Sequence, residues 1–271
     1  MLKRIITAIV LIAIFIPICI FSDTIFFPIT VGIISLMGVF EMTKCLGYHK
    51  NLWLSLPIYL IALGLPIFRM FVSTNLFFLA HVPSIFIGLL ISMLSYVMLR
   101  QNKDKISDVI TLYSLVIFVV SGFTSIVLVR DVKNGDEIYL LAFLGAWICD
   151  TFAYFTGKFF GKHKLIPKIS PKKTIEGSIG GIIFTIGGFA VYGLIMNTFF
   201  EAHLSYLILC VYGLILSIVS QFGDLIASSI KRQYDIKDYG FIFPGHGGIL
   251  DRFDGVLLVA PTLYALNYLF G

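Results

Sequence analysis

The order of apolar and polar positions along the chain predicts a series of membrane-spanning helices. Long apolar runs recur from one end to the other, and only short polar stretches separate them. The predicted spans are residues 5–21, 26–44, 52–68, 76–99, 109–129, 138–156, 177–199, 204–226 and 249–270. Because a helix of roughly 20 apolar residues crosses a bilayer, the pattern predicts an all-α, polytopic integral membrane protein with about nine transmembrane helices.

Composition supports the same class. Hydrophobic residues make up 58% of the 271 positions and charged residues only 13%, which is more apolar surface than one soluble core of this length can bury. No polar stretch is long enough for a separate soluble domain. We therefore expect one membrane-embedded domain over residues 1–271, whose motif-bearing half covers about residues 138–271.

The basic residues predict the orientation, because Lys and Arg in short loops concentrate on the cytosolic side. With a cytosolic amino terminus, nine spans place the two most basic loops, residues 157–176 and 227–248, on that side. The loops expected outside contain only Arg69, Arg130 and Lys133. Four lysines of the first basic loop are interpreted as topology signals that also attract anionic lipid: Lys158, Lys162, Lys164 and Lys168.

Glycines give the seventh predicted span small-residue faces of the kind that let helices approach closely. They are Gly177, Gly180, Gly181, Gly187 and Gly188. We expect them to serve packing.

Carboxylates near the ends of the last two spans are the first candidates for chemistry, because ionisable groups at membrane depth usually face a polar interior. Asp251 and Asp254 are three residues apart, so on a helix they share one face and repel each other unless a cation lies between them. Mg²⁺ suits such ligands, together with waters and substrate phosphate oxygens. Asp224 would add a third carboxylate, and the alternative is a structural ion pair with Arg252 or Lys231.

A glycine turn at residues 244–248, PGHGG, precedes these carboxylates and leads into a predicted helix amino terminus, where free backbone N–H groups favour phosphate. Lys231 and Arg232 lie before the turn, and Lys172 and Lys173 belong to the other basic loop. Cations, glycine amides and carboxylates together indicate a site for a magnesium polyphosphate.

Two further acids lie within predicted spans. Asp150 forms a polar stripe with Thr151 and Tyr154, which indicates either a polar contact between helices or a wall of a substrate cavity. Glu41 is close to Lys44, so a local ion pair at the membrane surface explains it.

Residues 228–254, SSIKRQYDIKDYGFIFPGHGGILDRFD, resemble the signature of the phosphatidate cytidylyltransferase family, also called CDP-diacylglycerol synthases. That signature reads S-x-apolar-K-R, four residues, K-D, a small residue, an apolar-Pro pair, H-G-G and D-R-apolar-D, and this chain fills every defined position. Two further stretches look like the same family: Ser170 to Thr174 with Glu176 and Gly177, and Asp150-Thr151 with Ala153, Tyr154 and Gly157.

The resemblance implies a helical membrane enzyme, a magnesium-dependent nucleotidyltransferase that moves a cytidylyl group from CTP to phosphatidate. The products would be CDP-diacylglycerol and pyrophosphate, for phospholipid biosynthesis. It also implies a lipid bilayer as environment, a homodimer in many members and no nucleic-acid partner. We expect the bacterial cytoplasmic membrane, with the active site facing the cytosol.

On this hypothesis Asp224, Asp251 and Asp254 hold Mg²⁺ and form the catalytic set with Lys231 and Arg232. The substrate-binding residues would be Lys172, Lys173, Ser228, Lys237, Asp238, His246, Gly247, Gly248, Arg252, Asp150 and Tyr154. One alternative is a cation-coupled transporter, which explains the acids at membrane depth but not the glycine turn. Another is a different phospholipid transferase such as a CDP-alcohol phosphotransferase, whose D-G-x-x-A-R arrangement is missing because VLLV follows Asp254-Gly255.

Overall fold

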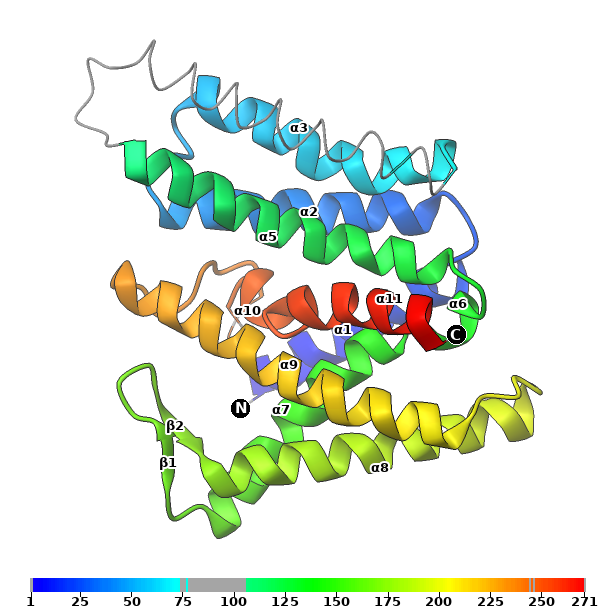
Figure 1. The fold of residues 1–271 in the computed structure, drawn as a ribbon. Helices are drawn as coiled ribbons and strands as arrows, with labels where there is room; N and C mark the ends of the chain where they lie inside the picture. Colours follow the sequence, from blue (N-terminus) through cyan, green and yellow to red (C-terminus); the bar gives the residue numbers. More distant parts are fainter. Residues whose placement is uncertain (1, 74–76, 78–105, 244, 246, 271) are drawn as a thin grey trace. The chain divides into compact units, whose positions relative to one another are not determined.

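The structure is a computed structural model that describes residues 2–73, 77, 106–243, 245 and 247–270, and helices dominate it (Figure 1). The elements are α1 (Leu2–Ile20), α2 (Phe26–Cys45), α3 (Leu52–Phe68), η1 (Arg69–Phe71), α5 (Ile106–Arg130), α6 (Gly135–Ile138), α7 (Leu141–Phe160), β1 (Lys164–Ile166), β2 (Ser170–Thr174), α8 (Ile175–Phe199), α9 (Tyr206–Gln233), α10 (Leu250–Phe253) and α11 (Val256–Phe270).

Within the described residues, six helices are long and apolar enough to cross a membrane. They are Phe26–Cys45, Leu52–Phe71, Ser107–Arg130, Gly135–Phe160, Ile175–Phe199 and Tyr206–Gln233. Val10–Ile20 and Val256–Phe270 are shorter apolar helices. The helical membrane class is therefore confirmed. The predicted span at 76–99 lies outside the described residues except for Phe77, so the number of spans stays a prediction.

The last predicted span is not one helix, and the prediction of a continuous helix from residue 249 to 270 is wrong. α10 ends at Phe253 and α11 begins at Val256. At the break, Asp254 Oδ1 accepts a hydrogen bond from the Gly255 backbone N–H at 2.9 Å. Such a local bond competes with continued helix. Asp251 and Asp254 consequently do not share the face of one helix.

The chain forms two compact units. Unit 1 contains Met1–Val127 and Asp238–Arg252, and unit 2 contains Leu128–Lys237 and Phe253–Gly271. In unit 1, α2 packs against α1 and α3. In unit 2, α7 packs against α8, α9 and α11, and α9 also contacts α8 and α11. The single functional domain over residues 1–271 stays a prediction.

Glycines bring α7 and α8 close together, as the sequence predicts. A Cβ atom on Gly180 would lie 2.3 Å from Thr156 Oγ1, and one on Gly177 would lie 2.6 Å from the Ala153 carbonyl oxygen. Both distances are far shorter than a van der Waals contact, so only glycine permits this approach. Gly187 differs, because nothing lies within 4 Å of the position of its Cβ.

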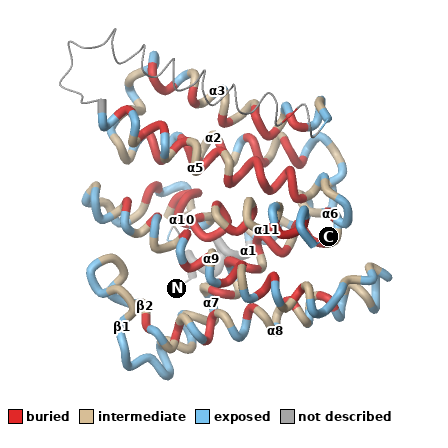
Figure 2. Tube along the Cα trace, viewed as in Figure 1, coloured by how far each residue is buried: buried red, intermediate tan, exposed pale blue. Residues whose placement is uncertain are grey.

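Much of the surface of α8 is apolar and exposed. Figure 2 shows few buried positions along α8, and only 28% of its most apolar window is buried. Large apolar side chains are exposed there, among them Ile179, Ile183 and Val191. This face suits contact with lipid, because a helix in a bilayer does not need to hide apolar side chains from its surroundings.

Gly180→Ala should destabilise the protein, because the added methyl group forces α8 away from Thr156. Overpacking of this kind typically lowers the free energy of unfolding by about 1–3 kcal/mol. The midpoint of thermal unfolding in detergent measures the effect. The matched control is Gly187→Ala on the same helix, which should leave the midpoint unchanged or raise it slightly; equal losses in both variants would contradict close packing at Gly180.

Candidate functional site

A pocket of about 420 Å³ lies in unit 2, where the end of α7, the β1–β2 hairpin, the start of α8 and the second half of α9 meet. Its polar lining consists of Asp150, Tyr154, Lys158, Lys164, Lys172, Lys173, Thr174, Ser178, Gln221 and Asp224. Five residues predicted to bind substrate or metal are thus brought together. They are Asp150, Tyr154, Lys172, Lys173 and Asp224.

One face of α7 forms a wall of this pocket. Asp150, Tyr154 and Lys158 follow one another at intervals of four residues and all line it, as expected for neighbours on one side of a helix. Asp150 and Tyr154 of the predicted polar stripe therefore line a cavity, whereas Thr151 does not. Binding of substrate in this cavity stays a prediction. The sequence analysis interprets Lys158 as a topology signal that attracts anionic lipid and misses its place in the pocket, although its spacing from Asp150 and Tyr154 indicates the shared face.

The β1–β2 hairpin supplies three of the four lysines that line the pocket, Lys164, Lys172 and Lys173. β1 pairs antiparallel with β2, with Lys164 opposite Thr174. Lys164 lines the pocket in addition to its proposed role in topology, and sequence reasoning missed it because no helical period extends into the loop. Thr174 fixes the base of the hairpin to α8, since its Oγ1 accepts a hydrogen bond from the Gly177 backbone N–H at 3.1 Å.

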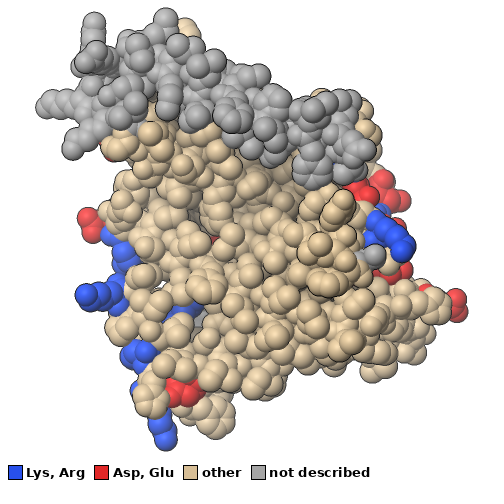
Figure 3. All heavy atoms as spheres, viewed as in Figure 1, with Lys and Arg blue, Asp and Glu red and all other residues tan. Residues whose placement is uncertain are grey.

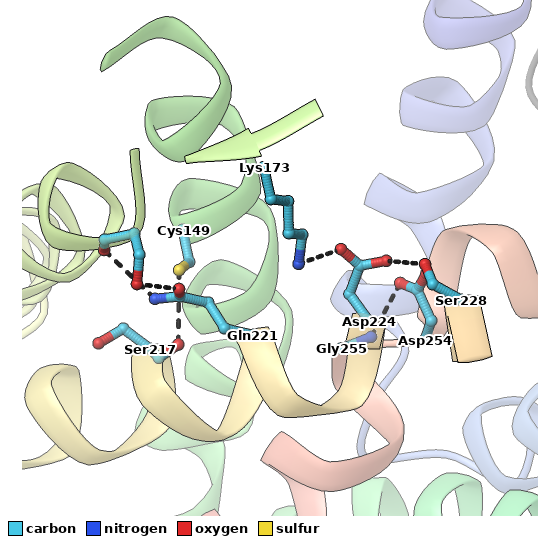
Figure 4. Close-up of polar contacts among 9 residues, drawn as sticks. Cys149, Lys173, Ser217, Gln221, Asp224, Ser228, Asp254 and Gly255 are labelled. Atoms are coloured by element: carbon cyan, nitrogen blue, oxygen red, sulfur yellow. Dashed lines mark hydrogen bonds and ion pairs between the residues drawn. The ribbon is translucent and has the colours of Figure 1, made fainter. Parts of the chain in front are cut away.

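Asp224 joins the hairpin to α9. Its carboxylate forms an ion pair with Lys173, and Ser228 Oγ donates a hydrogen bond to Asp224 Oδ1 at 3.3 Å (Figure 4). The side chains of Lys173 and Asp224 are 22% and 21% exposed. The pair is therefore largely shielded from water but still open to the pocket. Figure 4 also shows Asp254 beside Asp224.

The charges of the pocket favour a polyanion. Four lysines and two aspartates line it, which leaves two positive charges (4 − 2 = 2). Figure 3 shows Lys and Arg gathered where the hairpin lies in Figure 1. Arg232 Nε, near the end of α9, donates a hydrogen bond to the Ile169 carbonyl oxygen in the hairpin turn at 3.4 Å. The two basic segments of unit 2 consequently lie at the same end of its helices.

Carboxylate oxygens suitable for a divalent cation are present in unit 2. Asp254 is 8% exposed and lies within electrostatic range of Asp224, Asp150 and Lys231. Among the described residues, no group of three or more His, Cys, Asp and Glu side chains is arranged to hold a metal ion. Mg²⁺ commonly takes only one or two carboxylates, with waters and phosphate oxygens completing its shell. The donor chemistry of Asp224 and Asp254 fits such an ion.

The glycine turn belongs to unit 1. The Phe243 backbone N–H donates to the Gly247 carbonyl oxygen at 2.9 Å, and Gly245 and Gly247 have φ values of 80° and 82°. Residues with a Cβ rarely adopt this conformation, which explains the glycines. His246, predicted to bind substrate, lies outside the described residues.

Asp251 closes the same turn. Its Oδ2 accepts hydrogen bonds from the backbone N–H groups of Tyr239 at 2.8 Å and Gly248 at 2.9 Å. The predicted free amide at Gly248 is therefore already bound by a carboxylate of the chain itself. At this one amide the Asp251 carboxylate occupies the place expected for phosphate, and the binding of substrate by Gly248 stays a prediction.

Glu41 of α2 binds the next two amides. Its Oε1 and Oε2 accept hydrogen bonds from the backbone N–H groups of Ile249 and Leu250, both at 2.9 Å. The expected ion pair with Lys44 is therefore not the main role of Glu41, although the charge of Lys44 does act on it. Sequence reasoning could not find these contacts, because more than 200 residues separate the partners.

The other predicted residues are spread over both units. Ser228, Lys231, Arg232 and Lys237 belong to unit 2, while Asp238, Gly247, Gly248, Asp251 and Arg252 belong to unit 1. Lys237 and Arg252 are exposed, and Asp238 is half-buried. Their contacts with substrate stay a prediction.

An apolar pocket of about 230 Å³ adjoins the charged one. Leu165, Ser178 and Gln221 line both pockets. Ser178 Oγ donates to Gln221 Oε1, and Gln221 Nε2 donates to the Ser178 carbonyl oxygen at 3.3 Å. This polar pair, which sequence reasoning missed, separates a charged compartment from an apolar one that is lined mainly by Ile182, Ile218, Phe222 and Leu225.

Comparison with known proteins covers the whole chain. The model of the cytidylyltransferase family matches residues 2–270. A phosphatidate cytidylyltransferase of Staphylococcus haemolyticus is 37% identical over 268 residues, which is 97% of each chain. Proteins of the same name from Staphylococcus epidermidis and Staphylococcus aureus are 35% and 36% identical over 263 residues, again 97% of each chain.

Lys172→Ala should weaken the binding of inorganic pyrophosphate, because it removes one of four cations from the pocket. Loss of one charge-assisted contact should raise the Kd roughly five-fold at low salt. Calorimetric titration of the purified protein measures it. Lys168→Ala is the matched control, since Lys168 belongs to the same hairpin but does not line the pocket. Equal effects of the two substitutions would show that only the general charge of the hairpin matters.

Proposed function

The chain belongs to the cytidylyltransferase family, and we propose that it transfers a cytidylyl group from CTP to phosphatidate, giving CDP-diacylglycerol and pyrophosphate. The observation that carries the proposal is the similarity over 97% of both chains to proteins named phosphatidate cytidylyltransferase. A charged pocket beside an apolar one fits an enzyme whose substrates are a nucleotide and a lipid.

The reaction needs alignment and charge neutralisation more than a strong base. A phosphate oxygen of phosphatidate, already anionic near neutral pH, attacks the α-phosphorus of CTP. A new P–O bond forms while the bond from the α-phosphorus to the bridging oxygen breaks, and pyrophosphate leaves. The barrier is largely repulsion between two negative groups, so fixed cations lower it most effectively.

The lysines of unit 2 would supply that neutralisation. Lys158, Lys164 and Lys172 line the pocket from two sides and would contact phosphate oxygens of CTP or phosphatidate. Asp224 orients Lys173 through their ion pair, so the ammonium group is positioned before a substrate arrives. Such preorganisation avoids a rearrangement during the reaction.

We assign Mg²⁺ to the carboxylates of Asp224, Asp251 and Asp254, as expected from the sequence. Asp224 and Asp254 belong to one unit and have the oxygen ligands that Mg²⁺ prefers. When bound, the ion would neutralise charge on the triphosphate. Asp251 is assigned from the sequence motif alone.

The apolar pocket would take an acyl chain of phosphatidate. Its lining of Ile182, Ile218 and Phe222 is apolar, and the Ser178–Gln221 pair marks the change to the charged compartment. Phosphatidate has the same division, with its phosphate at the membrane surface and its chains in lipid. The lipid would thus remain in the bilayer during the reaction.

The apolar helices and the bacterial relatives support an integral membrane protein in a bacterium. We propose that the amino terminus and the charged pocket face the cytosol, where CTP is available. The gathering of both basic segments at one end of unit 2 supports this orientation. About nine spans and a homodimer stay predictions.

Purified protein supplied with labelled CTP, phosphatidate and Mg²⁺ should release pyrophosphate and form liponucleotide in equal amounts. Neither product should appear without phosphatidate. An intact preparation that forms neither product would refute the proposed function, and cation flux into sealed vesicles without nucleotide would instead favour a transporter.

In the same assay Asp251→Asn should abolish turnover, a loss of about 100-fold or more, while the variant still inserts and purifies. The amide oxygen of the new side chain can accept the hydrogen bonds that Asp251 Oδ2 receives from Tyr239 and Gly248, so the turn keeps its shape but loses a negative charge. Near-normal activity would remove Asp251 from the metal site.

Ile218→Trp should raise the KM for long-chain phosphatidate several-fold without changing the KM for CTP, because the larger side chain fills the apolar pocket. Leu214→Trp is the matched control. Leu214 and Ile218 are 43% and 39% exposed and lie one turn apart on α9, but only Ile218 lines the pocket. Equal KM values for phosphatidate in the two variants would argue against an acyl chain there.

A further inference from the structure

Glu41 is a buried acid on an apolar helix, far in sequence from the signature motif. It is 2% exposed and lies in the last turns of α2. An ionisable side chain in a spanning helix costs free energy unless it has partners, and it commonly marks a functional element. The partners here are the backbone N–H groups of Ile249 and Leu250, one for each carboxylate oxygen.

The segment that contains these amides packs directly against the Glu41 carboxylate. A Cβ atom on Gly240 would lie 2.3 Å from Glu41 Oε1, and one on Gly248 would lie 2.2 Å from the same oxygen. Two glycines of the signature, one before the glycine turn and one at its end, therefore approach the carboxylate so closely that no larger residue fits. We call the described residues 239–243, 245 and 247–251 the signature loop.

Glu41 and Asp251 divide the loop amides between them. Asp251 Oδ2 accepts the amides of Tyr239 and Gly248, and Glu41 accepts the next two in sequence. Because Ile249 and Leu250 directly precede Asp251, the hydrogen bonds to Glu41 fix the backbone that carries this aspartate. The loop conformation and the orientation of Asp251 are set together.

We propose that Glu41 is a positioning residue, which holds the signature loop in the conformation that presents Asp251 and the glycine turn to magnesium-bound CTP. This inference rests on the proposed function. Its physical basis is preorganisation. If the loop adopts its binding conformation only part of the time, the apparent Kd for substrate equals the intrinsic Kd divided by the fraction of time spent in that conformation, whereas saturating substrate restores the conformation.

Glu41→Gln tests the proposal with nearly unchanged side-chain size. The glutamine side chain has one acceptor oxygen, so it can accept a hydrogen bond from only one of the two backbone N–H groups. Its NH₂ group then lies against the other N–H group, and two donors face each other. We expect the KM for magnesium-bound CTP to rise about ten-fold, with kcat within about two-fold of the original value. Hydrogen exchange of the peptide covering residues 239–252 should accelerate by a similar factor, while peptides of α3 stay unchanged.

Lys44→Gln is the matched control. Lys44 is exposed, lies one turn from Glu41 on α2 and acts on it only through its charge. We expect KM, kcat and exchange of the loop to stay unchanged in this variant. If Lys44→Gln reproduces the effects of Glu41→Gln, the relevant partner of Glu41 is the lysine, and the proposal is wrong.

Three results would overturn the inference. They are an unchanged KM for CTP, a loss of kcat alone in proportion to the folded fraction, and unchanged exchange of the loop. If Glu41→Gln does not fold, Glu41→Asp decides, because it keeps the charge but shortens the reach; a raised KM and faster loop exchange are again expected. Lack of activity in the original protein would refute the proposed function, whereas the exchange measurement still tests the loop.

Discussion

Buried and half-buried carboxylates organise this protein, and each described one at the candidate site has partners within its own unit. An ionised carboxylate without a partner in a weakly polar environment is unfavourable by several kcal/mol or more. The chain meets this constraint in two ways. Glu41 and Asp251 bind backbone N–H groups of the signature loop, whereas Asp224 binds the ammonium group of Lys173. The loop of unit 1 and the pocket of unit 2 are both arranged around these contacts.

The two kinds of partner have different consequences. Backbone amides are fixed by the course of the chain, so the bonds to Glu41 define a shape and cannot easily be exchanged for others. A lysine is a long and rotatable partner, and the ammonium of Lys173 can contact a phosphate oxygen and Asp224 together. Under the proposed function, the acids of unit 1 maintain geometry, and the charged pair of unit 2 responds to substrate.

The sequence predicted the helical membrane class, the positions of most described helices and close helix packing at glycines of α8. These features follow from hydrophobic period, segment length and side-chain size, which are local properties. It also predicted several pocket residues, such as Lys173 in a recognisable motif and Asp224 near the end of a predicted span. The similarity to phosphatidate cytidylyltransferases bears out the family to which those motifs pointed.

Other features depend on contacts that no local pattern encodes. The break between α10 and α11 depends on one side-chain hydrogen bond of Asp254. The β1–β2 hairpin was not predicted, and Lys164 lies outside the motif from Ser170 to Thr174, so Lys164 was not recognised as a pocket residue. The sequence predicted an ion pair of Glu41 with its neighbour Lys44, because the backbone amides that Glu41 binds are more than 200 residues away in the chain.

The polar pair of Ser178 and Gln221 separates a charged compartment from an apolar one. For a reaction between a soluble nucleotide and a lipid, this boundary would also direct the two products, pyrophosphate and the liponucleotide, to different surroundings. Pyrophosphate carries no apolar part and would diffuse from the charged compartment into water, whereas the liponucleotide would return to the bilayer. Departure of the two products in different directions opposes their recombination, and no moving gate is required for it.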